Sequence, residues 1–270
     1  LVLLAGVTWI GVRLATRPLV QLANAADTLG PDLRASKLSE DGPLEVARAA
    51  RAFNAMQERI NTYMTERMQI LAAISHDLQT PITRMRMRAD MMDDSGQREK
   101  LNHDLKEMEA LVKEGVAYAR TLHGTSEPPC TIDPDALLES LVFDYIDAGQ
   151  KLELHGKVGH PIISRPNALR RVLINLIDNA LKFSTQVEVS VSAGADGRTT
   201  ILVLDNGPGI PEEDLETVFQ PFYRVEASRN RDTGGTGLGL AIAKQLTLAM
   251  NASLTLHNRA TGGLEARLVL

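Results

Sequence analysis

Apolar side chains recur at alternating intervals of three and four residues between positions 53 and 74, and this spacing strongly constrains the fold. The positions are Phe53, Met56, Ile60, Tyr63, Arg67, Ile70 and Ile74. Such spacing puts the residues on one stripe of a helix that packs against a second helix, as in a coiled coil. Arg67 is the exception within the stripe. We therefore expect a long helix that begins near Leu44.

A second helical pattern follows a predicted turn at residues 93–96. Its apolar positions are Leu101, Leu105, Met108, Val112, Gly115 and Ala119. Two helices joined by a short turn form a helical hairpin. One hairpin has too much apolar face to bury alone. A homodimer, in which two hairpins form a four-helix bundle, is the economical solution.

A polar segment with the sequence SHDLQTP, residues 75–81, lies within the first helix. His76 and Thr80 are four residues apart and share a helix face. An acid, Asp77, directly follows the histidine, and Pro81 should disturb the helix at the same turn because it lacks a backbone donor. This arrangement indicates chemistry at His76. A solvated coiled-coil histidine is the alternative when the segment is considered alone.

After a Gly/Ser/Pro-containing stretch at residues 124–129, the pattern changes to mixed helix and strand. Helical patterns cover residues 136–146, 168–183 and 238–250. Alternating apolar residues predict strands, at residues 186–193, 200–204, 253–256 and 264–270. The sequence therefore predicts a separate α/β domain after the helices.

The first twelve residues, LVLLAGVTWIGV, are apolar and uncharged. A bilayer span needs about 20 such residues, so we interpret the run as the end of a transmembrane helix. Arg13 and Arg17 then mark the cytoplasmic side. A buried core helix and a signal-peptide core are the alternatives, and the absence of a preceding basic segment argues against the second. A short amphipathic helix is expected at 19–29.

Composition excludes several classes of protein. The net charge is −5 and argues against a nucleic-acid surface. The one cysteine, Cys130, excludes an internal disulfide framework and a cysteine-rich zinc site. Aromatic residues are only 4% of the chain, which fits helical packing better than a β-sandwich.

Three further segments suit a nucleotide. Asn175, Asn179 and Lys182 fall on one helix face, where amide oxygens suit Mg²⁺ and an ammonium suits phosphate. Asp205 ends a predicted strand before the glycines of DNGPGI, residues 205–210, and could accept a hydrogen bond from the adenine amine. Each segment alone is more simply a solvated stripe or an ordinary turn.

The third segment is GGTGLGLA, residues 234–241, which passes from a polar loop into a helix whose first backbone donors could bind phosphate. It does not fit a dinucleotide fingerprint, since no apolar strand precedes it. Before it, Phe219 and Phe222 could anchor a loop whose arginines, Arg224 among them, reach phosphate oxygens. The order of all these segments, with His76 upstream, indicates a helix histidine that receives a phosphoryl group from ATP.

In this order the segments resemble the transmembrane sensor histidine kinases of bacterial two-component systems. The family's H, N, G1, F and G2 boxes are similar to SHDLQTP, NLIDNALKF, DNGPGI, FQPFYR and GGTGLGLAIA. Residues 16–60, with Pro18 and Gly42-Pro43-Leu44-Glu45, resemble a HAMP linker. Departures are Gln79 where Arg is frequent, Phe183 where Tyr is frequent, and Ser164-Arg165-Pro166 where Asp-Pro is common.

The resemblance implies a multidomain chain. It would comprise the end of a transmembrane helix (1–15), a HAMP linker (16–63), a dimerisation and phosphotransfer hairpin forming a dimeric four-helix bundle (64–124), and an α/β sandwich ATPase domain of Bergerat (GHKL) type (125–270). The protein would lie in the inner membrane of a bacterium, with the HAMP and kinase domains facing the cytoplasm.

The resemblance also implies residue roles. His76 would be phosphorylated from Mg²⁺-ATP, Asp77 would orient its imidazole and accept its proton, and Thr80 would position water when a response regulator is dephosphorylated. Asp205 would bind adenine, Asn179 would ligate Mg²⁺, and Lys182 would bind phosphates. The implied ATP site comprises Asn175, Asn179, Lys182, Phe183, Asp205, Gly207, Gly209, Phe222, Arg224, Gly235, Thr236, Gly237, Leu238 and Gly239.

Two other classes share parts of this pattern. Chaperone, topoisomerase and mismatch-repair ATPases have the same domain type, but they lack a His-acid-x-x-Thr-Pro hairpin before it. A catalytically inactive nucleotide-binding scaffold would not need the intact His76, Asn179 and Asp205. We therefore expect a kinase that phosphorylates an aspartate of a response regulator and also acts as its phosphatase.

Overall fold

The computed structural model describes residues 37–121, 127–194, 197–225 and 235–270, with isolated positions at 2, 5, 6, 9, 16, 20 and 22–24. The predicted membrane segment at 1–15 and amphipathic helix at 19–29 lie largely outside them. Among the described residues no helix is both long and apolar enough to cross a bilayer. Contacts divide the chain into two compact units, Leu1–Leu71 and Ala72–Leu270.

The long helix predicted from the heptad spacing is confirmed as α2, Leu44–Asp90. It continues through Pro81, so the proline does not end the helix. Proline removes one hydrogen bond, to the carbonyl of Asp77. The 46 other residues of the helix keep it continuous across that gap.

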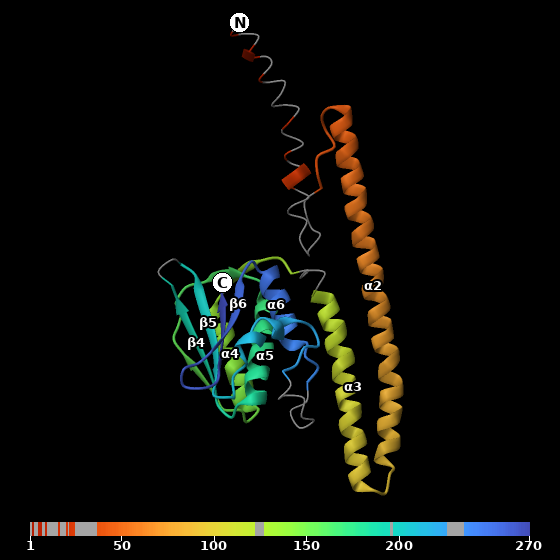
Figure 1. The fold of residues 1–270 in the computed structure, drawn as a ribbon, viewed down its shortest axis with the longest axis vertical. Helices are drawn as coiled ribbons and strands as arrows, with labels where there is room; N and C mark the ends of the chain where they lie inside the picture. Colours follow the sequence, from red (N-terminus) through yellow and green to blue (C-terminus); the bar gives the residue numbers. More distant parts are fainter. Residues whose placement is uncertain are drawn as a thin grey trace. The chain divides into compact units, whose positions relative to one another are not determined.

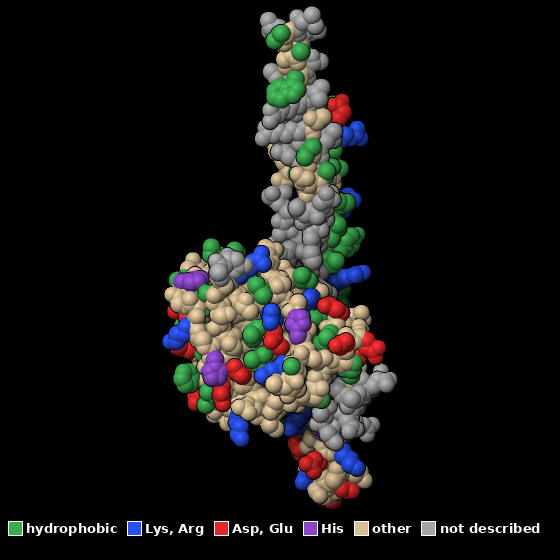
Figure 2. All heavy atoms as spheres, turned by 60° about the vertical axis from the view of Figure 1, so that its left-hand side comes forward, with side chains coloured by type: hydrophobic (Ala, Val, Ile, Leu, Met, Phe, Trp, Pro, Cys, Tyr) green, Lys and Arg blue, Asp and Glu red, His purple; other side chains and the backbone are tan. Residues whose placement is uncertain are grey.

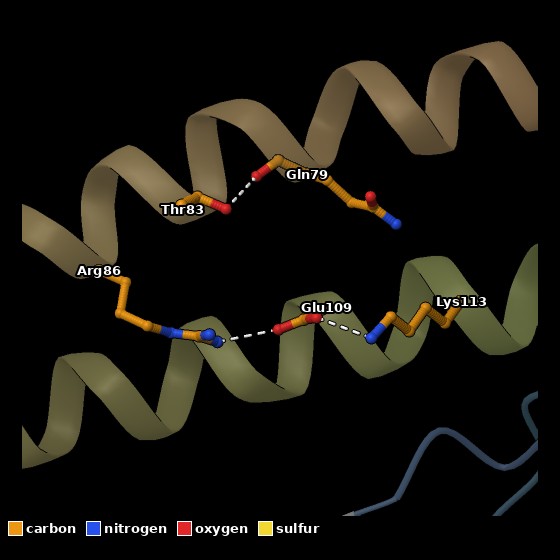
Figure 3. Close-up of polar contacts among 5 residues, drawn as sticks. All are labelled: Gln79, Thr83, Arg86, Glu109 and Lys113. Atoms are coloured by element: carbon orange, nitrogen blue, oxygen red, sulfur yellow. Dashed lines mark hydrogen bonds and ion pairs between the residues drawn. The ribbon is translucent and has the colours of Figure 1, made fainter.

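The second helix, α3, spans Ser95–Thr121 and forms the predicted hairpin with α2. The helix begins two residues earlier than expected because the side chain of Asp94 accepts hydrogen bonds from the backbone of Gly96 and Gln97. Between the helices, Glu109 of α3 accepts a hydrogen bond of 2.9 Å from Arg86 of α2, and within α3 it accepts one of 2.8 Å from Lys113 (Figure 3). The same two cations, Lys113 first, lower the pKa of Glu109.

Most of the predicted coiled-coil stripe is uncovered in the single chain. Ile70 and Ile74 keep 58% and 49% of their surface exposed, and Tyr63 keeps 66%. Phe53 is the buried exception. An apolar stripe of this length is unfavourable in water unless a second helix covers it.

The C-terminal half is a five-stranded sheet covered on one face by three helices (Figure 1). The helices are α4 (Pro134–Asp147), α5 (Pro166–Phe183) and α6 (Gly239–Ala249). The strands are β2 (Leu152–His155), β4 (Val187–Ala193), β5 (Thr199–Asp205), β6 (Ser253–Asn258) and β7 (Leu264–Val269). Their order is β2-β4-β5-β7-β6. Among the described strands, only β2 and β4 pair in parallel.

Alternating burial along β4 and β5 follows the alternating sequence that predicted them. Val187, Val189 and Val191 are buried, as are Ile201 and Val203, and these residues face the helices. The neighbouring positions of both strands are only partly buried. This is the pattern of an antiparallel sheet with one covered face. The core therefore lies between the sheet and α5.

Three short strands were not predicted from the sequence. They are β1 (Cys130–Ile132), β3 (Ile162–Ser164), which pairs with β1, and β2 at the sheet edge. Two 3₁₀ turns, η1 (Glu212–Asp214) and η2 (Thr217–Phe219), lie between the DNGPGI and GGTGLGLA segments. On the face seen in Figure 2, acidic and basic side chains are interspersed.

Candidate functional site

The predicted phosphoacceptor, His76, lies on the exposed surface of α2. Its side chain is 81% exposed and that of Asp77 is 84% exposed, with 3.5 Å between Nδ1 of His76 and Oδ1 of Asp77. Thr80, one turn further, is also exposed. The imidazole is therefore open to a reactant, and its Nδ1 faces the carboxylate that directly follows it.

Asp205, at the end of β5, is 94% buried. Its Oδ1 accepts hydrogen bonds from the backbone N–H groups of Gly207 (2.8 Å) and Leu264 (3.1 Å). No described residue donates a hydrogen bond to Oδ2. A buried carboxylate fixed through one oxygen leaves the other as an acceptor for a ligand donor.

Glycines allow the chain to pass close to this aspartate. A Cβ on Gly207 would lie 2.8 Å from the carbonyl oxygen of Phe183, and one on Gly209 would lie 2.6 Å from Oδ1 of Asn258. Gly209 also has a positive φ of 74°. The two glycines singled out in the sequence are therefore required sterically, because a larger residue at either position would clash.

Two supporting residues were missed in the sequence. Gly263, in the turn before β7, has φ of 95°, and a Cβ there would lie 2.0 Å from the carbonyl oxygen of Asp205. Arg259 donates a 2.7 Å hydrogen bond to that same oxygen. The Gly-Gly pair before the last strand was the available signal.

The loop after Asp205 is held from the other side by Asn258. Its side-chain oxygen accepts from the backbone N–H of Ile210 at 2.9 Å, and its amide donates to the carbonyl of Ile210 at 2.6 Å. Asn258 ends β6, so the outer strand of the sheet positions this loop. The sequence pattern did not indicate this role.

The polar face predicted on α5 is present and faces the glycine-rich segment. Asn175, Asn179 and Lys182 are all partly buried. Asn175 donates a 2.8 Å hydrogen bond to the carbonyl of Arg171, and its Oδ1 lies 3.4 Å from where a Cβ of Gly239 would be. Helix α5 thus packs directly against the beginning of α6.

Lys182 lies beside Gly235, where a Cβ would be only 2.3 Å from Nζ. The ammonium is also 5.0 Å from the centre of the Phe183 ring. Burial lowers the pKa of Lys182 and the charge of Arg224 lowers it further, whereas Glu114 and Glu107 raise it. Lysine, arginine and backbone donors therefore meet at one place.

The segment from Gly235 to Gly239 passes beside the Lys182 ammonium. Gly237 has φ of 74°, and a Cβ would lie 2.9 Å from the backbone of Phe222 and Tyr223. Phe222, itself at φ 64°, donates its backbone N–H to the carbonyl of Gly237 at 3.0 Å. Its side chain is 62% exposed.

No described residue caps the start of helix α6 with its side chain. Leu238, at the N-cap position, is fully buried and makes no side-chain hydrogen bond. The backbone N–H of Leu238 donates to the hydroxyl of Thr236 at 3.2 Å. Free N–H groups at the start of a helix favour an anion. The structure thus brings Lys182, Arg224 and the start of α6 together.

No cluster of three His, Cys, Asp or Glu side chains that could hold a metal ion occurs in the described parts of the chain. A magnesium ion held by one amide oxygen, phosphates and waters needs no such cluster. Asn179 has an amide oxygen on the same helix face as Asn175 and Lys182. The residues present therefore fit Mg²⁺ that arrives with a nucleotide.

Three domain families match the chain. Residues 11–62 match the HAMP domain, residues 66–122 match the His Kinase A (phospho-acceptor) domain, and residues 164–270 match the Histidine kinase-, DNA gyrase B-, and HSP90-like ATPase. The three matches follow the order of segments on which the sequence interpretation rested.

Curated relatives share this order over most of the chain. Sensor histidine kinase GtrS of Pseudomonas aeruginosa is 38% identical over 94% of this chain and 52% of its own length. Sensor histidine kinase CpxA of Escherichia coli is 33% identical over 95% of this chain and 58% of its own length. The chain thus spans little more than half the length of the curated relatives it matches.

Solved structures show the same fold. Full-length ShkA in complex with AMPPNP is 24% identical, with a TM-score of 0.56, over 74% of this chain and 45% of that one. The histidine kinase AdeS of Acinetobacter baumannii is 22% identical, with a TM-score of 0.51, over 72% of this chain and 96% of that one. The helical region followed by an α/β ATPase domain is therefore confirmed as the fold.

Proposed function

Because the chain belongs to the sensor histidine kinases of two-component systems, we propose that it phosphorylates His76 from ATP and passes the phosphoryl group to an aspartate of a response regulator. The observation that carries this proposal is the convergence of Asp205, Lys182 and the start of α6 around one site. The exposed His76–Asp77 pair supplies the acceptor in the same chain.

ATP would bind with its adenine at Asp205 and its phosphates at Lys182 and the start of α6. The amine of adenine would donate to Oδ2 of Asp205, while Oδ1 remains bonded to Gly207 and Leu264. Lys182, Arg224 and the backbone N–H groups at the start of α6 would bind the phosphates. Gly209, Phe183 and Phe222 line the proposed site, as do Asn175, Gly235, Thr236, Gly237, Leu238 and Gly239. The adjoining Gly207 allows the close approach of the backbone.

Mg²⁺ would be held by the amide oxygen of Asn179 and by the phosphates. When bound, it would neutralise charge on the transferring group. The chain's own contribution there is an amide ligand and the Lys182 ammonium on one helix face. Their spacing fixes both groups relative to the nucleotide.

At His76 the proposed step forms a phosphorus–nitrogen bond and breaks the bond between the γ-phosphorus and the bridging oxygen of ADP. Asp77 lies 3.5 Å from Nδ1, so the proton would reside at Nδ1 and leave the Nε2 lone pair to attack. Asp77 would then accept the Nδ1 proton as positive charge develops. General-base assistance of this kind is typically worth about 10²–10⁴-fold in rate.

The domain assignment is part of the proposal. Residues 1–15 would complete a transmembrane helix, 16–63 a HAMP linker, 64–124 the hairpin and 125–270 the ATP-binding domain. The HAMP match and the sensor-kinase relatives support a bacterial inner-membrane protein with these domains facing the cytoplasm. The uncovered stripe of α2 supports a homodimer.

The test is phosphate transfer from γ-labelled ATP with Mg²⁺. The chain should acquire label that is labile in acid and stable in alkali, and His76→Gln should acquire none. His103→Gln, on the same hairpin, is the matched control and should label normally. Label that persists in His76→Gln would exclude His76 as the acceptor.

Thr80 separates the two expected activities toward the regulator. The side chain lies one turn from His76 on the exposed surface, where its hydroxyl could position water. Thr80→Ala should keep autophosphorylation and lose dephosphorylation of the phosphorylated regulator, measured as loss of label over time. Intact dephosphorylation in this variant would contradict the assignment.

A further inference from the structure

Helix α3 of the hairpin places an acidic side chain on the proposed phosphate-binding segment. Thr236 forms a hydrogen bond through its hydroxyl with the carboxylate of Glu114, although the two residues are 122 positions apart in sequence. Both belong to the unit Ala72–Leu270. Next to Glu114 along α3, Ala117 and Tyr118 pack against the core of the ATPase domain. The contact is therefore part of a packed surface.

The carboxylate lies among groups proposed to bind phosphate. A Cβ on Gly235, adjacent to Thr236, would lie 2.3 Å from Nζ of Lys182, and Leu238 donates its backbone N–H to the same hydroxyl that bonds Glu114. Glu114 and Glu107 both stabilise the charged form of Lys182. Two carboxylates of α3 thus provide the negative charge that phosphates would otherwise bring.

We propose that Glu114 is an internal competitor of the ATP phosphates, which holds α3 on the ATPase domain until a polyphosphate displaces it. The polyphosphate and the carboxylate are both anionic and repel each other at close range. Both would also bind the hydroxyl of Thr236 and interact with the ammonium of Lys182. Nucleotide binding would therefore release the ATPase domain from α3, and this release rests on the proposed function of the site.

The competition has a direction that can be measured. Releasing Glu114 opposes ATP binding, so removing its charge should tighten ATP binding. The effect should grow with the number of phosphates and be absent for adenosine, which carries none. A purely structural role for Glu114 would change the affinities for all ligands alike.

The experiment measures dissociation constants of AMPPNP, ADP and adenosine with Mg²⁺, by titration calorimetry on the full chain. Glu114→Gln keeps the shape and hydrogen-bonding capacity of the side chain while removing its charge. We expect it to bind AMPPNP about fivefold more tightly, as for one like charge removed at about 4 Å in water. ADP should gain less, and adenosine should be unaffected.

Two variants in the same helix serve as controls. Glu107→Gln should give a smaller gain, because Glu107 influences Lys182 less than Glu114 does. Glu99→Gln, exposed at the beginning of α3, should give none. Unchanged AMPPNP affinity in Glu114→Gln, or an equal gain for adenosine, would overturn the proposal.

The result is distinguishable from failure of the proposed function. If the chain were not an ATP-dependent kinase, the unaltered protein would not bind AMPPNP or would not label at His76. If only the competition is wrong, the unaltered protein binds and labels, and Glu114→Gln behaves like it. Glu114→Ala provides a second variant that removes the hydrogen bond as well, and it should show the same dependence on phosphate number.

Discussion

At the scale of single residues, the proposed nucleotide site depends on backbone positions that favour glycine. Gly262 and Gly263 are neighbours, and both have positive φ, 87° and 95°. A Cβ at Gly262 meets no atom within 4 Å, whereas one at Gly263 would lie 2.0 Å from the carbonyl oxygen of Asp205. An alanine at Gly262 would therefore meet backbone strain alone, whereas one at Gly263 would meet strain and a steric clash.

We expect Gly263→Ala to destabilise the ATPase domain by about 2–5 kcal/mol, since strain and overpacking add. Gly262→Ala should cost only the strain, about 1–2 kcal/mol. Chemical denaturation of both variants measures the difference, and nucleotide affinity should fall only in Gly263→Ala. Equal losses would mean that the Asp205 loop moves aside at little cost.

The lowered pKa of Lys182 predicts a pH effect on binding. The side-chain amine of Lys182 attracts phosphate only while it is protonated. Burial, together with the charge of Arg224, lowers its pKa, so it loses its proton at a lower pH than an ordinary lysine does. Affinity for ADP should therefore weaken as pH rises through the alkaline range below the usual lysine pKa. Bound phosphate itself favours the protonated form, so the weakening should be gradual.

Lys182→Arg is the matched variant for this prediction, because guanidinium stays charged throughout that range. Its ADP affinity, measured by calorimetry across the same pH series, should be flatter than that of the unaltered chain. A parallel decline in both proteins would assign the pH effect to another group.

At the scale of elements, helix α5 obtains its N-terminal cap from outside the helix. Arg165 at the N-cap position makes no side-chain capping hydrogen bond. Glu127, 40 residues away, accepts hydrogen bonds from the backbone of Asn167 (3.1 Å) and Ala168 (3.3 Å). It also accepts one from the Asn167 side chain at 2.7 Å. The departure from Asp-Pro at residues 165–166 is thereby compensated.

Glu127→Ala should destabilise the ATPase domain by about 1 kcal/mol, the usual cost of losing a cap. Asp133→Ala is the comparator, because Asp133 caps α4 directly through the backbone of Asp135 and Ala136. Thermal unfolding should show that the two variants lower the midpoint temperature by similar amounts. An unchanged midpoint for Glu127→Ala would mean that water caps α5 equally well.

The elements that sequence predicted best are those with long periodic patterns. Helix α2 follows from its heptad spacing and α5 from its apolar face, and both are confirmed within a few residues. The strands β1, β2 and β3 are three or four residues long, too short for alternation to distinguish them from loops. Pro81 lies inside α2, because one missing hydrogen bond does not outweigh those of the rest of a long helix.

The site shows the same division. Asp205 stood out because it ends a predicted strand before glycines, and Lys182 because it shares a helix face with Asn175 and Asn179. The glycines of residues 234–239 stood out because they precede a predicted helix. Asn258, Arg259 and Glu114 carry no local signal, since each acts on a segment 48 or more residues away. Such partners depend on tertiary contacts, which one sequence does not reveal.

At the scale of the whole molecule, the uncovered stripe of α2 predicts assembly. Ile70→Glu places a charge on the stripe and should shift the chain from dimer toward monomer, because burying an unpaired charge between helices is costly. Gln69→Glu adds the same charge one residue away, off the stripe, and should leave the dimer intact. Light scattering coupled to size exclusion measures both masses, and a dimer that survives Ile70→Glu would contradict a seam through this residue.

The unbroken course of α2 has a mechanical consequence. Arg86, which is hydrogen-bonded to Glu109 of α3, and His76 lie on the same part of α2, and the helix continues between them. At 1.5 Å for each of the 86 − 76 = 10 residues, they are about 15 Å apart along the helix axis. The direction in which the imidazole points relative to this contact with α3 is then set by a count of residues: removing one between them would turn it by about 100°, and removing seven would return it to within about 20°.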